Sequence, residues 1–235
     1  LLHPAEVIEA AEVAYREGTA PLAGVEGFIR QVLGWREYVH CVYWRWMPEY
    51  RDRNALGAHR PVPPAFTGQA PTEMACVANV LEHVFEHGYA HHIERLMVLG
   101  NLALTSGVDP RAMTDWMWAG FVDAAEWVML PNVIGMALHA DGGMMATKPY
   151  ASGGAYLNRM SDHCRGCRYD PRQRTGPDAC PFTTLYWDFL ARHEEQFRSN
   201  HRMARPLAGL ARLGDLAEVR DRASEVLVAL DTGRL

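Results

Sequence analysis

A cysteine-rich loop in the last third of the chain is the feature that most constrains the fold. Cys164 and Cys167 form a C-x2-C pair, and Cys180 follows a segment that contains proline and glycine. Three thiolates at this spacing can converge on one metal centre, so the fold has to bring a fourth ligand to them. The candidates for that ligand are Cys76, Cys41 and His163.

The spacing leaves the kind of metal centre open. Soft thiolates suit zinc or an iron-sulfur cluster. Structural zinc sites usually combine two short cysteine or histidine pairs, whereas this chain has one short pair. A cluster with one distant ligand fits better, and Pro181 after the last cysteine resembles a common ferredoxin ending. A cluster is therefore favoured, with zinc and a metal-free loop as the alternatives.

Composition indicates a soluble protein with a sizeable core. The chain has 235 residues, 49% of them hydrophobic, which is enough for one large domain or two small ones. It shows no signal-peptide pattern and no apolar run long enough to span a membrane. Its odd cysteine count favours thiolates in a reducing compartment. The first residue, Leu1, indicates a processed chain or a fragment.

Charge is distributed unevenly. The net charge of −5 argues against a wholly basic nucleic-acid binder. Arginines nevertheless gather around the cysteine loop and could form a local anion-binding face. They are Arg159, Arg165, Arg168, Arg172 and Arg174.

Hydrophobic spacing predicts an all-α fold, because no run of alternating strand residues is present. The predicted helices cover residues 4–16, 22–47, 72–88, 89–104, 181–198 and 216–230. The apolar, tryptophan-rich segment 111–138 is interrupted by Gly120 and Pro131, which predicts two or three short buried helices. Residues 48–71 and the glycine-rich 139–155 are expected to be loops, the second suited to close approach of a ligand.

Two adjacent histidines, His91 and His92, fall in one predicted helix. Neighbouring residues on a helix point about 100° apart, so one of them is expected to be structural. The other could donate a proton. Arg95 shares the helical face of His91 and needs a charged partner, for which Asp123 is the candidate. A structural ion pair is the simplest interpretation.

Aromatic residues are expected mainly in the core. Trp116, Trp118 and Trp127 lie in the apolar segment, and a redox role for them would require a cofactor nearby. Trp35, followed by Arg36 and Glu37, is interpreted as a packing residue beside a surface ion pair.

A set of specific motifs runs through nearly the whole chain. It includes Gly34-Trp35-Arg36-Glu37-Tyr38, Met47-Pro48-Glu49-Tyr50, His91-His92-x-x-Arg95, Leu130-Pro131-Asn132-Val133-Ile134-Gly135-Met136, Lys148-Pro149-Tyr150 and Asn158-Arg159-Met160-Ser161-Asp162. Together these motifs resemble those of the photolyase and cryptochrome family, specifically its bacterial branch that carries an iron-sulfur cluster and includes (6-4) photolyases.

The resemblance implies a fold and a cellular setting. Family members have an N-terminal α/β domain with an antenna chromophore, here expected to be a lumazine, and then an all-helical domain that binds FAD. Residues 1–235 are similar to the C-terminal part of the helical domain, with the cluster loop at 158–182, and the α/β domain is expected to be absent from this chain. A monomeric protein of the bacterial cytoplasm, acting on UV-damaged DNA and not on membranes, is implied.

The resemblance also implies the ligands of the metal centre. The family pattern maps a 4Fe-4S cluster onto Cys76, Cys164, Cys167 and Cys180. Cys41 is left over and is expected to be a buried small apolar residue.

The resemblance implies roles around the flavin. Arg95 and Asp123 match the ion pair that lies against FAD, and Asn132 would line the pocket of its ring system. Trp116 and Trp118 would relay electrons to the flavin. Two positions depart from the pattern: Met129 replaces a carboxylate of some relatives, and Met117 replaces an expected aromatic residue.

On the lesion side, His92, with His91 beside it, matches the histidine that faces the damaged base. Tyr150 lies on the loop that approaches a flipped lesion, and Trp35 matches the aromatic residue next to it. Arg159 and Arg165 would contact DNA phosphates. The implied activity is light-dependent repair of (6-4) photoproducts by electron transfer from reduced FAD. The alternatives are a cryptochrome, which senses blue light without repair, and a helical zinc-bound scaffold.

Overall fold

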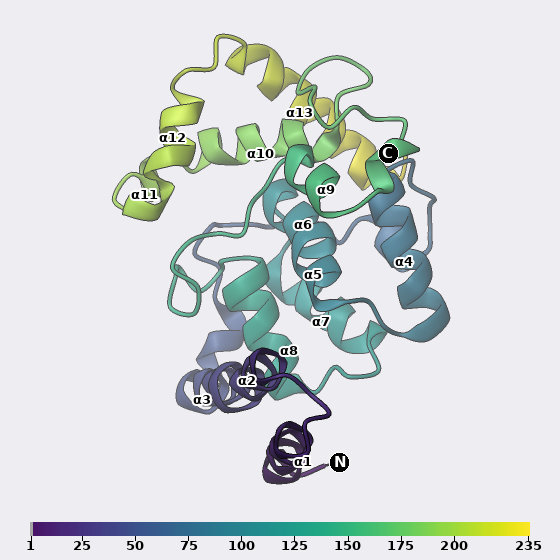
Figure 1. Ribbon diagram of the computed structural model, residues 1–235. Coiled ribbons are helices and arrows are strands. Elements are labelled where there is room, and N and C mark those ends of the chain that lie inside the picture. Colours follow the sequence, from purple (N-terminus) through teal and green to yellow (C-terminus); the bar gives the residue numbers. More distant parts are fainter. Residues whose placement is uncertain (1) are drawn as a thin grey trace.

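The computed structural model describes residues 2–235, which fold into a helical assembly (Figure 1). The α-helices are α1 (Pro4–Arg16), α2 (Leu22–Arg30), α3 (Glu37–Trp46), α4 (Ala75–His87), α5 (His92–Glu94), α6 (Asn101–Ser106), α7 (Pro110–Gly120), α8 (Glu126–Pro131), α9 (Gly154–Met160), α10 (Pro181–Arg192), α11 (Glu194–Phe197), α12 (Ala204–Leu210) and α13 (Leu216–Asp231). Within residues 2–235, β pairing is limited to two isolated bridges, Arg60 with Val108 and Asp170 with Ala179. The predicted all-α class is confirmed.

Three π-helical segments continue α-helices without a break, at Gln31–Arg36, Arg95–Gly100 and Asn132–Ala137. The first joins α2 to α3, so the chain is helical from Leu22 to Trp46. This agrees with the single long helix predicted over residues 22–47. The other two lie in the part of the chain that holds the candidate site. Such π-helical turns often mark functional sites, because the extra residue in the turn redirects side chains.

The helix that carries the histidines begins later than predicted. His91 is its N-cap and not a helical residue: its Nδ1 accepts the N–H of Ile93 at 3.2 Å, and the Glu94 carboxylate accepts the N–H of His91 at 2.9 Å. This reciprocal capping box satisfies two backbone donors that a helix start leaves free. His91 therefore has a structural role, and α5 starts at His92.

Pro131 does not interrupt its helix, contrary to the sequence prediction. The chain stays helical from Glu126 through Ala137, with Pro131 ending α8 and the π-helical segment following directly. A proline inside a helix removes one backbone donor. Directly after the proline, Nδ2 of the Asn132 side chain donates to the carbonyl oxygen of Val128 at 2.7 Å.

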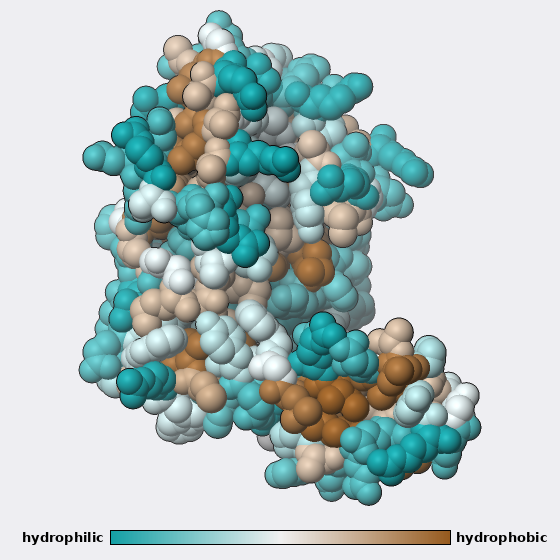
Figure 2. Space-filling model, turned by 60° about the vertical axis from the view of Figure 1, so that its left-hand side comes forward, coloured by the Kyte–Doolittle hydropathy of each residue, from teal (hydrophilic) through white to brown (hydrophobic). Residues whose placement is uncertain are grey.

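The core lies around α6, whose residues are all buried, and α10 packs against both α6 and α13. The α1–α2 hairpin projects from the opposite end of the molecule, and α1 buries none of its residues. Figure 2 shows an apolar surface over this hairpin. An apolar groove there is lined by residues that include Tyr15, Leu22, Ile29 and Leu33. None of the helices in residues 2–235 is both long and apolar enough to cross a membrane.

Candidate functional site

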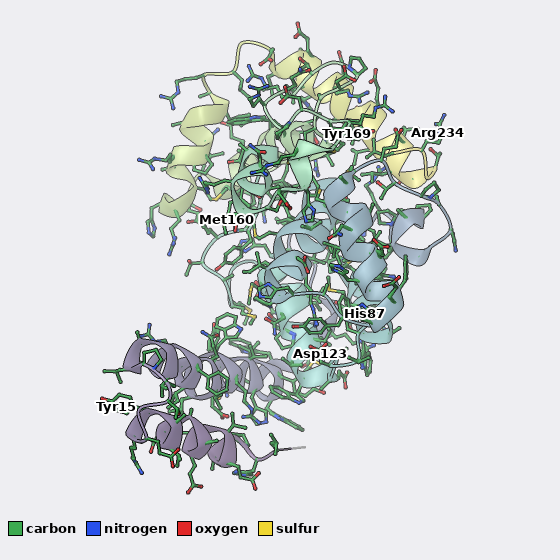
Figure 3. The ribbon with its side chains drawn as sticks, turned by 45° about the vertical axis from the view of Figure 1, so that its right-hand side comes forward. Tyr15, His87, Asp123, Met160, Tyr169 and Arg234 are labelled. Carbon is green, nitrogen blue, oxygen red and sulfur yellow. The ribbon has the colours of Figure 1, made fainter. Side chains whose placement is uncertain are left out.

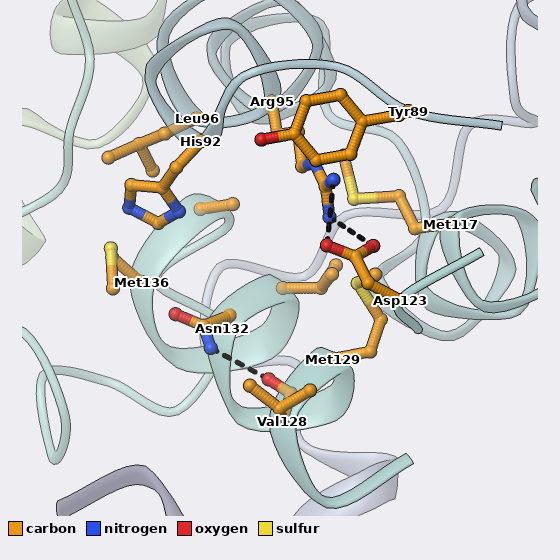
Figure 4. Close-up of a pocket in the computed structure, with 12 residues that line it drawn as sticks. Tyr89, His92, Arg95, Leu96, Met117, Asp123, Val128, Met129, Asn132 and Met136 are labelled. Atoms are coloured by element: carbon orange, nitrogen blue, oxygen red, sulfur yellow. Dashed lines mark hydrogen bonds and ion pairs between the residues drawn. The ribbon is translucent and has the colours of Figure 1, made fainter. Parts of the chain in front are cut away.

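A pocket of about 230 Å³ opens between the helix that follows His91 and the α8 region (Figure 4). It combines an arginine, an aspartate, a histidine and an asparagine with an otherwise apolar wall. Its lining residues are Tyr89, His92, Arg95, Leu96, Met117, Asp123, Val128, Met129, Asn132, Val133, Met136 and Ala137. A mostly apolar cavity with a few convergent polar groups is the usual form of a small-molecule site.

The guanidinium of Arg95 is held from four directions. Its two terminal nitrogens donate to the two carboxylate oxygens of Asp123 at 2.9 and 3.0 Å, and Nε donates to the carbonyl of Ala90 at 2.7 Å. The guanidinium also lies 4.2 Å from the ring centre of Phe121 and 4.9 Å from that of Tyr89. The expected pair of Arg95 with Asp123 is present, and its bidentate geometry fixes the charge at the pocket wall.

Asn132 presents an acceptor to the pocket that has no partner. Its Nδ2 donates to the Val128 carbonyl, whereas its Oδ1 is buried and accepts no hydrogen bond from residues 2–235. Buried polar atoms are rarely left unsatisfied, so this oxygen suits an N–H donor on a bound molecule. The ring system of a flavin carries such a donor, and the pocket chemistry fits it.

His92 lines the pocket, and its outer side stays open to solvent. Burial of the imidazole against the pocket wall lowers its pKa below the usual 6.5, and the positive charge of Arg95 acts in the same direction. The neutral form of His92 is therefore favoured near neutral pH. As an N-cap, His91 does not line the pocket.

Trp35 and Tyr150 lie outside the pocket lining. Trp35 packs 5.7 Å from Tyr38, and the Tyr38 hydroxyl donates to the carbonyls of Met144 and Met145 in the loop that also carries Tyr150. Tyr150 is 37% exposed. Trp35 packs against a residue that is hydrogen-bonded to the loop carrying Tyr150. Neither of the two aromatic residues contacts the cavity.

The two tryptophans of α7 occupy different environments. Trp116 packs 5.1 Å from Phe66 and 6.2 Å from Phe121, and its Nε1 donates to the Phe66 carbonyl at 2.8 Å. Because Phe121 also contacts Arg95, aromatic contacts connect Trp116 with the pocket. Trp118 instead lies at the surface, 39% exposed, with the Arg51 guanidinium over its ring.

The sequence did not reveal Tyr89 and Phe121 as partners of Arg95. Both follow a glycine at the end of a helix, Gly88 and Gly120, and both lie in connections between helices although the predicted helical segments 89–104 and 111–138 included them. The two departures from the family pattern, Met117 and Met129, are buried and form part of the pocket wall. An aromatic residue directly after a helix-ending glycine is the sequence signal that could have identified Tyr89 and Phe121.

A second constellation gathers four cysteines. Cys76 in α4, Cys164 and Cys167 in the loop, and Cys180 before α10 line one narrow cavity of about 10 Å³, together with His163. Burial raises the pKa of the Cys180 thiol to about 11, and burial together with the neighbouring thiols raises the pKa of Cys76. The positive charge of a metal centre would reverse these shifts, since thiolates are the ligand form.

The donor set fits an iron-sulfur cluster. A Cβ at Gly154 would lie 2.8 Å from the Cys180 sulfur, so a side chain at this position would displace the sulfur. Within residues 2–235 no group of three or more His, Cys, Asp or Glu side chains is arranged to hold a single metal ion. A cluster differs from a single ion because its cysteines bind different iron atoms.

Cys41 is exposed, which corrects the expectation of a buried residue. Val39 and Val42 define the buried face of α3, and Cys41 points away from it.

Figure 3 shows Asp123 and Tyr169, which represent the pocket and the cysteine loop, near opposite ends of the helical body. The two constellations are therefore separate sites.

Sequence comparison places these features in a family, although no family model matches the chain. The chain is 52% identical over 233 residues to a (6-4) photolyase of Agrobacterium fabrum, an alignment that covers 98% of this chain and 46% of that protein. An uncharacterized protein of Acanthamoeba polyphaga mimivirus is 29% identical over 102 residues, 43% of this chain and 76% of that protein. The chain thus spans about half the length of the photolyase it matches. By this identity over almost all of its residues, the chain belongs to the bacterial (6-4) photolyase and cryptochrome family.

Proposed function

We propose that this chain is the catalytic helical part of a DNA photolyase that uses light to repair (6-4) pyrimidine-pyrimidone photoproducts. One observation carries the proposal: His92, the fixed Arg95–Asp123 pair and the unpartnered Asn132 oxygen line one pocket in a chain 52% identical to a (6-4) photolyase. Residues 1–235 would form the C-terminal part of the FAD-binding domain.

The pocket would hold the ring system of FAD. The Asn132 oxygen would accept a hydrogen bond from the ring, and the Arg95–Asp123 pair would lie against it. The apolar wall, with Met117 and Met129, would exclude water from the ring. When bound, reduced FAD would supply, on excitation by blue light, one electron to the lesion.

His92 would act on the lesion. A photoproduct inside a duplex is inaccessible, so the damaged bases must flip out to reach the pocket. An imidazole nitrogen of His92 would then supply the proton that lets the transferred oxygen return to its original base, after which the electron would return to the flavin and the proton to His92. Trp35 and Tyr150, related through the same loop, would contact the flipped bases.

Trp116 would relay electrons inward before repair. Its contacts with Phe121, and those of Phe121 with Arg95, give it a short path to the pocket. Trp118, at the surface beside Arg51, would accept electrons from solvent reductants. The relay would keep FAD in the reduced state that repair requires.

A 4Fe-4S cluster would join the cysteine loop, residues 158–182, to α4 through Cys76, Cys164, Cys167 and Cys180. The common cavity of the four thiols supports this assignment. We favour a structural role, because the loop and the pocket lie near opposite ends of the helical body. Any antenna chromophore, with a lumazine as the candidate, would bind outside residues 1–235.

UV-damaged DNA would be the partner of a monomeric protein in the bacterial cytoplasm. Arg159 and Arg165, both exposed, would contact DNA phosphates near the cysteine loop. Such contacts give affinity without sequence preference, which suits an enzyme that must act at any damaged site.

The direct test is repair by the protein loaded with reduced FAD. A duplex with one (6-4) photoproduct is incubated with it under blue light and in darkness, and the restored pyrimidines are measured by chromatography. We expect repair in light only. If the protein has bound both FAD and the lesion DNA but the lesion persists in light as well as in darkness, the repair function is refuted and the cryptochrome alternative is favoured.

A further inference from the structure

A basic surface lies on the segment that follows α10. Between Gln196 and Gly214 the sequence contains four arginines and His201 but no aspartate or glutamate, although the whole chain carries a net charge of −5. We call these four arginines the arginine face. They are Arg198, Arg202, Arg205 and Arg212, and all are exposed.

The helix orients this face toward solvent. Met203 and Leu210 are the buried residues on the inner side of α12 and the turn before it. Arg205 lies in α12 and Arg212 in the turn that follows it, and both side chains are exposed. Figure 3 shows nitrogen-tipped side chains that point outward from this end of the molecule.

The charges of the arginine face are largely unneutralised. Among residues 2–235, Arg202, Arg205 and Arg212 form no ion pair, and Arg198 has only an exposed contact of 3.5 Å with Glu194. An exposed pair at that distance contributes little. The guanidiniums are therefore free to bind an anion.

Three of the five arginines around the cysteine loop differ in this respect, whereas Arg159 and Arg165 form no ion pair within residues 2–235. Arg168 pairs with Glu73, Arg172 with Asp170 and Arg174 with Asp215. Each of these carboxylates offsets one positive charge. The larger free positive charge thus lies on the arginine face and not on the cysteine loop that the sequence pointed to.

The arginine face is fixed to the loop that follows the pocket. Asn200, between Arg198 and Arg202, donates through Nδ2 to the carbonyl of Thr147 at 2.9 Å, next to Lys148. This loop, residues 139–151, begins just after the π-helical segment that lines the pocket, and it carries Tyr150. Figure 1 shows α11 beside this loop, on the other side of α10 from the cysteine loop.

We propose that the arginine face binds the phosphate backbone of duplex DNA and holds the duplex beside the 139–151 loop. The inference rests on the proposed function in one respect: the lesion that enters the pocket belongs to this duplex. Free guanidiniums in a row bind successive phosphates and release the counterions held there. The contact is independent of base sequence, and undamaged DNA binds the face as well.

The test compares a variant of the face with a charge-matched control. Arg202, Arg205 and Arg212 are replaced together by Gln in one variant, and Arg16, Arg30 and Arg111 in the other. The control arginines are exposed and already paired with carboxylates, and both variants lose the same charge. Binding of fluorescent duplexes, with and without a (6-4) photoproduct, is measured by anisotropy in darkness from about 50 to about 200 mM salt.

We expect the face variant to weaken binding of both duplexes about tenfold or more and to lower the slope of log K against log salt by about 3, roughly one per lost phosphate contact. The control should keep the wild-type slope. Equal slopes for the face variant and wild type would overturn the proposal, as would equal losses in both variants.

The outcomes separate the two proposals. In one outcome, the wild type prefers the lesion duplex while the face variant keeps the wild-type slope of log K against log salt. This result refutes DNA binding by the arginine face and leaves the repair function standing. Loss of affinity in the face variant without lesion preference in wild type supports the face and contradicts repair. A wild-type protein that binds no duplex refutes both. Circular dichroism of each variant confirms that its helices are intact.

Discussion

Arg95 and Asp123 meet through two hydrogen bonds of 2.9 and 3.0 Å although 28 positions separate them in the sequence. The Arg95 side chain is only 15% exposed, whereas that of Asp123 is 50% exposed. The arginine is thus enclosed between aromatic rings and depends on a partner that remains accessible. Loss of the aspartate would leave the guanidinium without a carboxylate partner among the residues that the structure describes.

We expect Asp123→Ala to lower the free energy of unfolding by about 1–2 kcal/mol, because a largely buried charge loses its bidentate partner while solvent compensates in part. The same change should weaken FAD binding. Asp52→Ala is the control, since its pair with Arg111 is exposed on both sides and contributes about 0.5 kcal/mol or less. Urea denaturation measures both variants, and equal losses of stability would contradict the special role of Asp123.

The proton role of His92 predicts a pH dependence of repair. Burial lowers the pKa of His92 below 6.5, so the proton-donating imidazolium becomes populated only as the pH falls below that value. Repair per light pulse should therefore rise between about pH 8 and about pH 5 and level off below the pKa of His92. His92→Ala should abolish repair and retain FAD, which the visible spectrum reports. A yield that rises with pH, or flavin loss in the variant, would instead assign His92 to packing.

The four-cysteine arrangement predicts which thiol the cluster needs. Cys76→Ala should lose iron, because Cys76 shares a cavity with the three loop cysteines, whereas Cys41→Ala should keep it, because Cys41 is exposed on α3. Iron and acid-labile sulfide per protein, together with far-UV circular dichroism, are the measurements. Iron loss in the Cys41 variant alone would refute the ligand assignment.

Local signals account for the parts of the fold that the sequence predicts well. Gly88 adopts a left-handed conformation with φ of 61° and ends α4, as a glycine after a periodic apolar run predicts. The beginnings of helices were less predictable. His91 caps α5 through its imidazole, a role that histidine shares with more common capping residues and that spacing alone does not reveal.

Tertiary contacts explain the remaining differences. Cys41 is exposed because α3 buries the side that holds Val39 and Val42, and only packing decides between the sides of an apolar helix. The Arg95 site shows the same limit. Its ion pair with Asp123 was predictable as a charge that needs a partner, but the enclosing ring of Phe121 comes from the connection between α7 and α8, which only the fold brings to Arg95.

His139 lies beyond the pocket, at the start of the 139–151 loop, and combines three unfavourable features. It is 4% exposed, its backbone is left-handed with φ of 50°, and its buried Nδ1 has no hydrogen-bond partner. Burial lowers its pKa below 6.5, and the nearby carboxylate of Asp141 offsets the shift in part. The neutral imidazole is the form that the fold accepts.

The protein should therefore lose stability in mild acid. The unfolded chain takes up a proton at His139 below about pH 6.5, while the folded protein resists it, so the free energy of unfolding falls as the pH drops from 6.5 through the lower pKa of the folded state. His139→Asn tolerates the left-handed backbone and does not titrate. We expect it to cost about 1 kcal/mol at pH 8 through lost packing against Phe197, yet to reduce the loss of stability between about pH 7 and about pH 5. His87→Asn, on the exposed side of α4, should leave the acid dependence as in wild type, and an unchanged dependence in the His139 variant would show that other groups cause it.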